Sequence, residues 1–146
     1  MWGAAFKPGT NDVRESPALA LAHALQQAGG NVTVHDPQAV ASAMTRNPEL
    51  DYTSDLAASV DAADLLVLAT EWPEYRQADP QALVHRPANP LLVDCRTTLN
   101  PEPWRTAGWL STSSDDPASR TRITSCPLTD RFRMNPAESS SWHLGS

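Results

Sequence analysis

A polar stretch near the start of the chain carries the residue types best suited to binding chemistry. Residues 5–17 read AFKPGTNDVRESP, with Lys7 and Arg14 in a loop that follows an apolar segment. Pro8-Gly9 predicts a tight turn, because proline fixes φ and glycine tolerates positive φ. Ser16-Pro17 predicts the N-cap and first residue of a helix. An ammonium, a guanidinium and the first amides of a helix together suit an anionic ligand.

The same two cations also have a purely structural interpretation. Lys7 and Arg14 can be solvated loop charges, with Arg14 paired to Asp12 or Glu15, since surface ion pairs are common and weak. The loop alone does not decide between a ligand site and a surface ion pair.

No metal site or disulfide framework is indicated by the remaining ligand-type residues. The cysteines and histidines are scattered and lack the spacing of metal ligands: Cys95, Cys126, His23, His35, His85 and His143. We therefore predict reduced thiols, no bound metal and no catalytic histidine.

The acidic balance of the chain limits its partners. The formal charge is −6 over 146 residues, and residues 1–110 hold seven Lys or Arg against thirteen Asp or Glu. Nucleic acid and anionic membranes are therefore not expected as partners. The sequence contains no apolar run near the roughly 20 residues of a membrane span, and no signal peptide follows Met1. We predict a cytoplasmic protein.

Short apolar segments alternate with helical patterns along residues 1–110, and five of these segments are typical of strands. The run LLVLA has the length of a parallel strand buried on both faces. Expected strands lie at 2–6, 31–35, 50–53, 65–69 and 91–94, and expected helices at 17–28, 38–45, 55–60, 73–84 and 101–107. This alternation predicts an α/β fold: an open, mostly parallel Rossmann-like sheet with helices on both faces.

Beyond Trp109 the alternation ends. Residues 111–146 are rich in Ser, Thr, Pro and Arg and contain too few aliphatic residues to bury a face. We therefore predict an α/β domain over residues 1–110, with a first strand that starts abruptly at Met1 and is truncated, followed by a disordered tail over 111–146.

Each unusual polar residue follows an expected strand. Ligands of open α/β sheets bind outside the carboxyl ends of the strands, where loops converge. The residues expected at this edge are Lys7, Asp36, Glu71, Trp72 and Arg96.

Four motifs resemble the C-terminal, UDP-sugar-binding domain of the UDP-glucose/GDP-mannose dehydrogenase family. AFKPGTNDVRESPAL is similar to the family's AFKPGTDDVRESPAL, and VHDP to its YDP turn. LATEWPEYR is similar to its LTEWxEF segment, and LVDCRTTLNPEPWRTAGW to its IDGRNxLDPxxxxxAGF segment. The chain departs from this pattern at Asn11, where the family has Asp, and at Cys95, where it has Gly.

The resemblance implies a role for each matching residue. Phe6 and Lys7 match positions that contact the nucleotide sugar, and Arg96 matches the arginine that reaches the uridine diphosphate. We expect Arg14 to have a structural role, as an ion pair or a support of the helix start. Asp36, Glu71 and Trp72 are expected at the edge of the site or as its support.

Cys95 has two interpretations. A thiol beside Arg96 can be a nucleophile, since nearby positive charge lowers the pKa of a thiol. In the family, however, the catalytic cysteine belongs to a middle segment that this chain does not contain. We therefore interpret Cys95 as a small packing residue and predict no catalytic residue in the chain.

The resemblance also implies a cofactor and partners. The family's enzymes oxidise the C6 alcohol of a nucleotide sugar to a carboxylate with NAD, and Gly3 and Gly9 do not have the G-x-G-x-x-G spacing of an NAD site. We expect a UDP-sugar-binding domain that alone is inactive and binds no NAD. Its expected partners are the NAD-binding and central domains or a second copy of itself. The alternative is a non-catalytic remnant or partner-binding α/β module.

Overall fold

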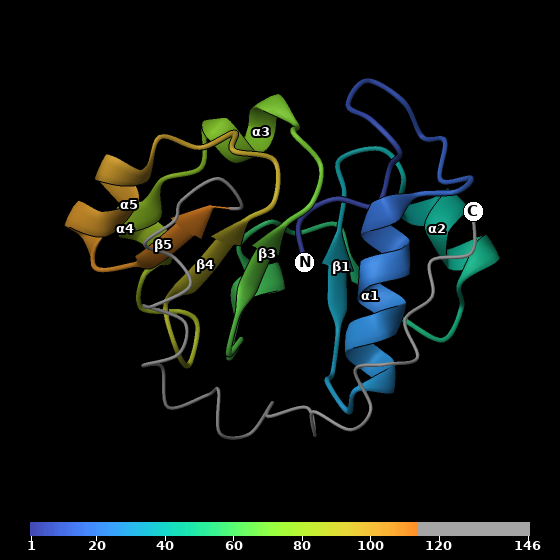
Figure 1. Cartoon of the computed structure of the whole chain (residues 1–146), viewed down its shortest axis with the longest axis horizontal. Coiled ribbons are helices and arrows are strands. Elements are labelled where there is room, and N and C mark those ends of the chain that lie inside the picture. Colours follow the sequence, from blue (N-terminus) through green and yellow to red (C-terminus); the bar gives the residue numbers. More distant parts are fainter. Residues whose placement is uncertain (114–146) are drawn as a thin grey trace, which may run out of the picture. The chain divides into compact units, whose positions relative to one another are not determined.

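A parallel β-sheet runs through residues 1–113, the part of the chain that the structure, a computed structural model, describes (Figure 1). Residues 114–146, most of the predicted tail, lie outside the described residues, as do Cys126 and His143. The elements in chain order are α1 (Pro17–Gln27), β1 (Thr33–His35), α2 (Val40–Arg46), β2 (Asp51–Thr53), the 3₁₀ turn η1 (Ala58–Val60), β3 (Leu66–Leu68), α3 (Pro73–Arg76), α4 (Pro80–Leu83), β4 (Leu91–Asp94), α5 (Pro101–Ala107) and β5 (Leu110–Ser113).

Trp2, in the chain's first segment, joins two groups of parallel strands. β1 pairs with β2, and β4 pairs with both β3 and β5. Trp2 forms parallel bridges to His35 on β1 and to Leu68 on β3. The resulting order is β2, β1, the Trp2 segment, β3, β4, β5. The predicted open parallel sheet is therefore confirmed, and its central segment pairs at a single residue on each side.

Gly3 permits the close approach of this central segment to the end of β3. Its φ is +112°, and a Cβ atom at this position would lie 2.4 Å from the Thr70 hydroxyl oxygen and 2.7 Å from the Thr70 backbone nitrogen. Because the second contact is with backbone, a side chain at residue 3 would force the sheet apart.

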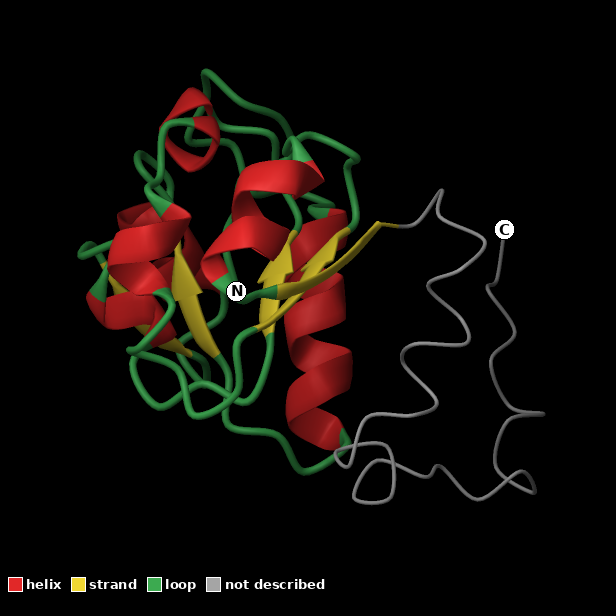
Figure 2. Ribbon diagram, turned by 90° about the vertical axis from the view of Figure 1, so that its left-hand side faces the viewer, coloured by secondary structure: helices red, strands yellow, loops and turns green. Residues whose placement is uncertain are grey.

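The core is built around Trp2, which is fully buried. Its ring stacks on Tyr75 at a centroid distance of 4.9 Å and meets the edge of Trp104 at 6.0 Å. Helices lie on both sides of the strands, as predicted (Figure 2). The β3 residues are buried on both faces, as predicted for the centre of LLVLA, whereas Leu65 lies before the strand and is 36% exposed.

The residues predicted to start α1 and to end α5 are found in those roles. The Ser16 side chain accepts a hydrogen bond from the Leu19 N–H at the start of α1, and Pro17 is its first residue. α5 ends at Gly108, whose φ of +110° is the left-handed conformation that glycine favours at a helix end.

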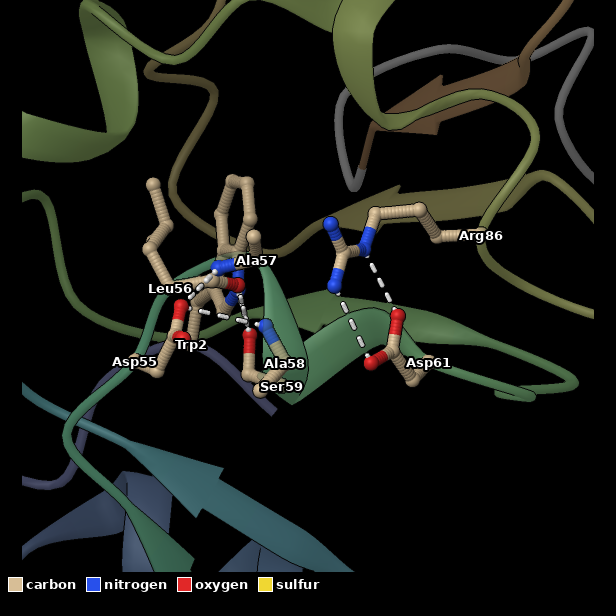
Figure 3. A network of polar contacts seen from close by, with 8 residues as sticks. All are labelled: Trp2, Asp55, Leu56, Ala57, Ala58, Ser59, Asp61 and Arg86. Carbon is tan, nitrogen blue, oxygen red and sulfur yellow. Dashed lines mark hydrogen bonds and ion pairs between the residues drawn. The ribbon is translucent and has the colours of Figure 1, made fainter.

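The helix predicted over residues 55–60 is wrong, because only the short turn η1 forms there. The Asp55 carboxylate accepts the N–H groups of Ala57 and Ala58 at 2.9 and 3.2 Å, which caps the turn. The Trp2 indole N–H donates to the Ser59 hydroxyl at 2.8 Å (Figure 3). The chain then becomes extended at Asp61, so the helical conformation ends after the single turn η1.

The end of the α/β body also differs from the prediction. β5 continues the sheet to Ser113, three residues past the expected boundary at residue 110, and pairs Val93 with Thr112. Ser111 and Thr112 are buried although their side chains are polar. The sequence has no apolar pattern that would predict this strand. β5 is held in the sheet by backbone hydrogen bonds to β4, which do not depend on its side chains.

No helix within residues 1–113 combines the length and the apolar composition that crossing a bilayer requires.

Candidate functional site

The loops that carry the predicted site residues all leave the same edge of the sheet, here called the carboxyl edge. The strands are parallel, so the loops after the Trp2 segment, β1, β3 and β4 emerge together, at the top in Figure 1. The connections through α1 and α2 lead to one side of the Trp2 segment, and those after β3 lead to the other. The sheet order therefore reverses beside the Trp2 segment, and such a point is where open α/β sheets bind ligands.

Asp36 holds three of these loops together. One oxygen of its buried carboxylate accepts the N–H groups of Ala4 and Ala5 at 2.9 and 3.0 Å, and the Trp72 indole N–H at 2.9 Å. The other oxygen accepts the N–H groups of Gln38 and Ala39 at 2.9 and 2.8 Å. With five donors on one carboxylate, Asp36 supports the edge and leaves no oxygen exposed to a ligand. Trp72 is buried beside it.

The loop that follows the Trp2 segment presents Phe6 and Lys7 to solvent. It is closed by a hydrogen bond from the Phe6 N–H to the Asp12 carbonyl at 2.9 Å. The Thr70 hydroxyl donates to the Ala5 carbonyl at 3.0 Å, which fastens the base of the loop to the end of β3. The Phe6 side chain is 55% exposed despite being apolar, and Lys7 is exposed beside it.

Arg14 forms a local ion pair, as the structural interpretation predicts. Its guanidinium donates to both oxygens of Asp12 at 3.0 and 2.9 Å. These bonds from Arg14 lower the pKa of the Asp12 carboxyl to about 2. The start of α1 has few free N–H groups for binding an anion. Pro17 has no N–H, and the Leu19 N–H already donates to the Ser16 hydroxyl oxygen.

The backbone around Arg96 is folded over the buried Asp94 carboxylate at the end of β4. Asp94 accepts the N–H groups of Arg96, Thr98 and Leu99 at 2.9, 2.7 and 2.8 Å. Thr97 has a φ of +52°, an uncommon conformation for a residue with a branched side chain. The peptide that carries Arg96 is thereby fixed in position.

The Arg96 side chain reaches back to the loop after β3. One Nη of its guanidinium donates to the Glu71 carboxylate at 2.9 Å, and an Nη of Arg76 on α3 lies 3.9 Å from the other oxygen of Glu71. The side chains of Arg96 and Glu71 are 48% and 35% exposed. The structure therefore brings Glu71 and Arg96 together at the carboxyl edge.

Sequence reasoning missed Asp94 and Arg76. Asp94 lies inside the motif LVDCR, and Arg76 lies at the end of the motif LATEWPEYR. A carboxylate that directly follows a buried strand and precedes a turn was the signal for Asp94, as it was for Asp36.

Cys95 lacks the environment of a nucleophile. Burial raises the pKa of its thiol, the Asp94 carboxylate raises it further, and the nearby Arg96 only partly opposes this. Its backbone N–H donates to the Leu68 carbonyl at 3.0 Å, which continues the pairing of β4 with β3. Cys95 is exposed, however, so the interpretation as a packing residue is not confirmed.

The start of α1 offers few free amides to a dinucleotide. A dinucleotide rests its pyrophosphate on free amides at the start of the first helix, and Ser16 and Pro17 remove two of those amides at α1. The part of the chain that the structure describes also holds no group of three His, Cys, Asp or Glu residues arranged for a metal ion.

A reversal of strand order beside convergent loops defines a Rossmann-like α/β domain of the nucleotide-binding class. Comparison with known families places the chain within that class. Residues 1–101 match the UDP binding domain of the UDP-glucose/GDP-mannose dehydrogenase family. The chain belongs to this family.

Curated relatives carry the name UDP-glucose 6-dehydrogenase. The protein from Pseudomonas aeruginosa is 45% identical over 107 residues, which cover 69% of this chain and 24% of the relative. The TuaD protein of Bacillus subtilis is 34% identical over 119 residues, which cover 81% of this chain and 26% of the relative. The chain thus spans about a quarter of the length of these relatives.

Solved structures of similar fold carry related titles. A UDP-glucose dehydrogenase from Pyrobaculum islandicum superposes with a TM-score of 0.58 at 30% identity, covering 74% of this chain and 24% of that one. An NDP-N-acetyl-D-galactosaminuronic acid dehydrogenase from Methanosarcina mazei gives a TM-score of 0.67 at 25% identity, covering 77% and 23%.

Proposed function

We propose that the carboxyl edge binds the uridine diphosphate part of a nucleotide sugar, and that Phe6, Lys7 and Arg96 make the contacts. The observation that carries the proposal is that two cations from distant parts of the sequence follow strands that end at the same edge of the sheet. Lys7 follows the Trp2 segment and Arg96 follows β4, with only β3 between these strands. Two strand spacings of roughly 4.8 Å separate the strands that carry them.

Each of the three side chains has a chemical role in this proposal. The Arg96 guanidinium offers several N–H donors in a fixed plane, which suits the paired oxygens of a diphosphate. The Lys7 ammonium is a point charge on a flexible stem. Phe6 supplies an exposed apolar face for the nucleotide sugar. Their joint effect is to hold and orient the nucleotide end of the ligand.

The oxidation step lies outside this proposal. NAD is the family's cofactor, and the start of α1 offers few free amides to it. We expect residues 1–113 to contribute binding and orientation, and we place no catalytic group among them. A UDP-sugar is the proposed ligand, and the proposed partners are NAD-binding and central domains or a second copy of this chain.

Thermal unfolding with added ligand tests the proposal. We expect UDP and UDP-glucose at millimolar concentration to raise Tm, because a ligand that binds only the folded state stabilises it. NAD should leave Tm unchanged. The Arg96→Ala variant should lose the response to UDP.

Arg86→Ala is the matched control, since Arg86 is also an exposed arginine paired with a carboxylate. It contacts Asp61 at 2.7 Å, and both residues precede β3 and β4, at the opposite edge of the sheet (Figure 3). This variant should respond to UDP like the unmodified chain. An unmodified chain whose Tm does not change with UDP would instead favour a partner-binding module.

Lys7 allows a direct measurement, because it is the only lysine in the sequence. Reductive methylation with ¹³C-formaldehyde introduces one dimethyl-lysine signal, which retains its positive charge. UDP should shift this signal in the unmodified chain and leave it in place in Arg96→Ala. An unmoved signal at saturating UDP would remove Lys7 from the site.

A further inference from the structure

Glu71 places a negative charge inside the proposed anion site. Its carboxylate lies between two guanidiniums, 2.9 Å from Arg96 and 3.9 Å from Arg76. One Nη of Arg96 already donates to Glu71, so a diphosphate that engages the guanidinium at the carboxyl edge would meet this carboxylate. The arrangement of one carboxylate and two arginines is therefore more than a surface ion pair.

We propose that Glu71 competes with the diphosphate for Arg96, and that Arg76 retains Glu71 when Arg96 turns to the ligand. This inference rests on the proposed function of the carboxyl edge. It makes Glu71 and Arg76 residues that set the affinity for the nucleotide without touching it.

The geometry confines the exchange to side chains. The Arg96 backbone is fixed by Asp94, which accepts three N–H groups from the turn. The side chains of Arg96, Glu71 and Arg76 are 48%, 35% and 55% exposed, so solvent weakens each ion pair. Arg96 can therefore leave Glu71 at little cost in free energy. Arg76 then remains beside Glu71, so the carboxylate is not left without a cation next to the bound anion.

Glu71→Gln tests the competition, because glutamine keeps the shape and one acceptor oxygen and removes only the charge. We expect UDP to bind this variant about three- to fivefold more tightly, the range that an exposed charge pair contributes. Arg76→Gln should weaken UDP binding by a similar factor, because Glu71 then holds Arg96 alone. Isothermal titration of the full chain at low salt measures both.

Two controls separate competition from other effects. Glu74→Gln removes the same unit of charge from the exposed start of α3 and should leave the UDP affinity unchanged within twofold. Uridine, which has no phosphate, should bind the unmodified chain and Glu71→Gln equally when followed through the methylated Lys7 signal.

The outcomes distinguish this inference from the proposed function. If the unmodified chain binds UDP and Glu71→Gln binds it equally or more weakly, Glu71 orients Arg96 and the competition is refuted. Equal tightening of uridine and UDP would also refute it, because the gain would then not depend on phosphate. If the unmodified chain binds no UDP at all, the proposed function fails and this inference fails with it.

Discussion

At the scale of single residues, the carboxyl edge depends on buried carboxylates that never meet solvent. Asp36 and Asp94 each end a strand and accept N–H groups from the turn that follows. Such bonds satisfy backbone donors that would otherwise be buried without partners. The backbone of the loops that carry Phe6, Lys7 and Arg96 is therefore held in place by buried carboxylates.

Asp36→Asn should destabilise the fold. An asparagine keeps one acceptor oxygen but replaces the other with an NH₂ group. That NH₂ group would face N–H groups that now donate to the second carboxylate oxygen, so donor would meet donor. Leaving buried donors unpaired should cost at least about 2 kcal/mol. Chemical denaturation measures the loss of unfolding free energy, and thermal unfolding should show a fall in Tm of roughly 8 °C or more.

Asp51→Asn is the control for this variant, because Asp51 is exposed on the edge strand β2. Its free energy of unfolding should change by less than about 0.5 kcal/mol. Equal stability of the Asp36 and Asp51 variants would contradict the central role of Asp36.

At the scale of elements, the sheet includes a strand, β5, that the apolar pattern of the sequence does not predict. β5 is short and polar, yet it covers the edge of β4, whose Leu91 and Leu92 are buried. The Leu110 N–H starts this pairing by donating to the Pro90 carbonyl at 2.8 Å. β5 is thus placed by backbone hydrogen bonds and by the turn at Gly108.

Leu110→Pro tests whether β5 belongs to the sheet in solution. Proline removes the N–H that donates to Pro90, so the full chain should lose about 1–3 kcal/mol of stability. Leu110→Ala keeps this N–H and removes a side chain that is 38% exposed, so it should cost less than about 1 kcal/mol. Denaturant titration of both variants makes the comparison, and an equal effect would argue against the pairing.

At the scale of the whole molecule, two buried basic groups make stability depend on pH. Burial lowers the pKa of the Met1 α-amino group from 8.0 to about 5, and this group donates to the Thr33 carbonyl at 2.7 Å. Burial also lowers the pKa of His35, although the neighbouring Asp36 opposes the shift. Both groups are neutral in the folded chain under conditions where they are charged in the unfolded chain.

The free energy of unfolding should therefore rise between pH 5.5 and pH 8. The unfolded state binds more protons in this window, so the stabilisation is complete above pH 8 and is lost as the pH falls towards 5. The α-amino group alone contributes on the order of 2–4 kcal/mol over its full shift. Denaturation of the full chain at a series of pH values measures this slope.

Acetylation of the amino terminus removes one of the two titrations. The acetylated chain should have a shallower slope, and the slope that remains belongs mainly to His35, whose contribution is lost below its ordinary pKa of about 6.5. Identical slopes for the acetylated and unmodified chains would show that the Met1 amine is not buried in solution.

Much of this architecture is predictable from the sequence, because it depends on local chemistry. Ser16-Pro17 and Gly108 mark helix ends through their own conformational preferences, and the centre of LLVLA is continuously apolar because Leu66–Leu68 are buried on both faces. That Lys7 and Arg96 follow strands ending at the same edge of the sheet is predictable from strand direction. These features need no knowledge of distant contacts.

The tertiary structure alone decides features that depend on partners far along the chain. β5 forms because β4 offers unpaired backbone groups, and η1 ends after one turn where the chain becomes extended at Asp61. The pairing of Arg96 with Glu71 requires the ends of β3 and β4 to lie side by side. Local preferences act within a few residues, whereas the pairing of β4 with β5 and of Arg96 with Glu71 joins residues 19 and 25 positions apart, so only the folded chain brings them together.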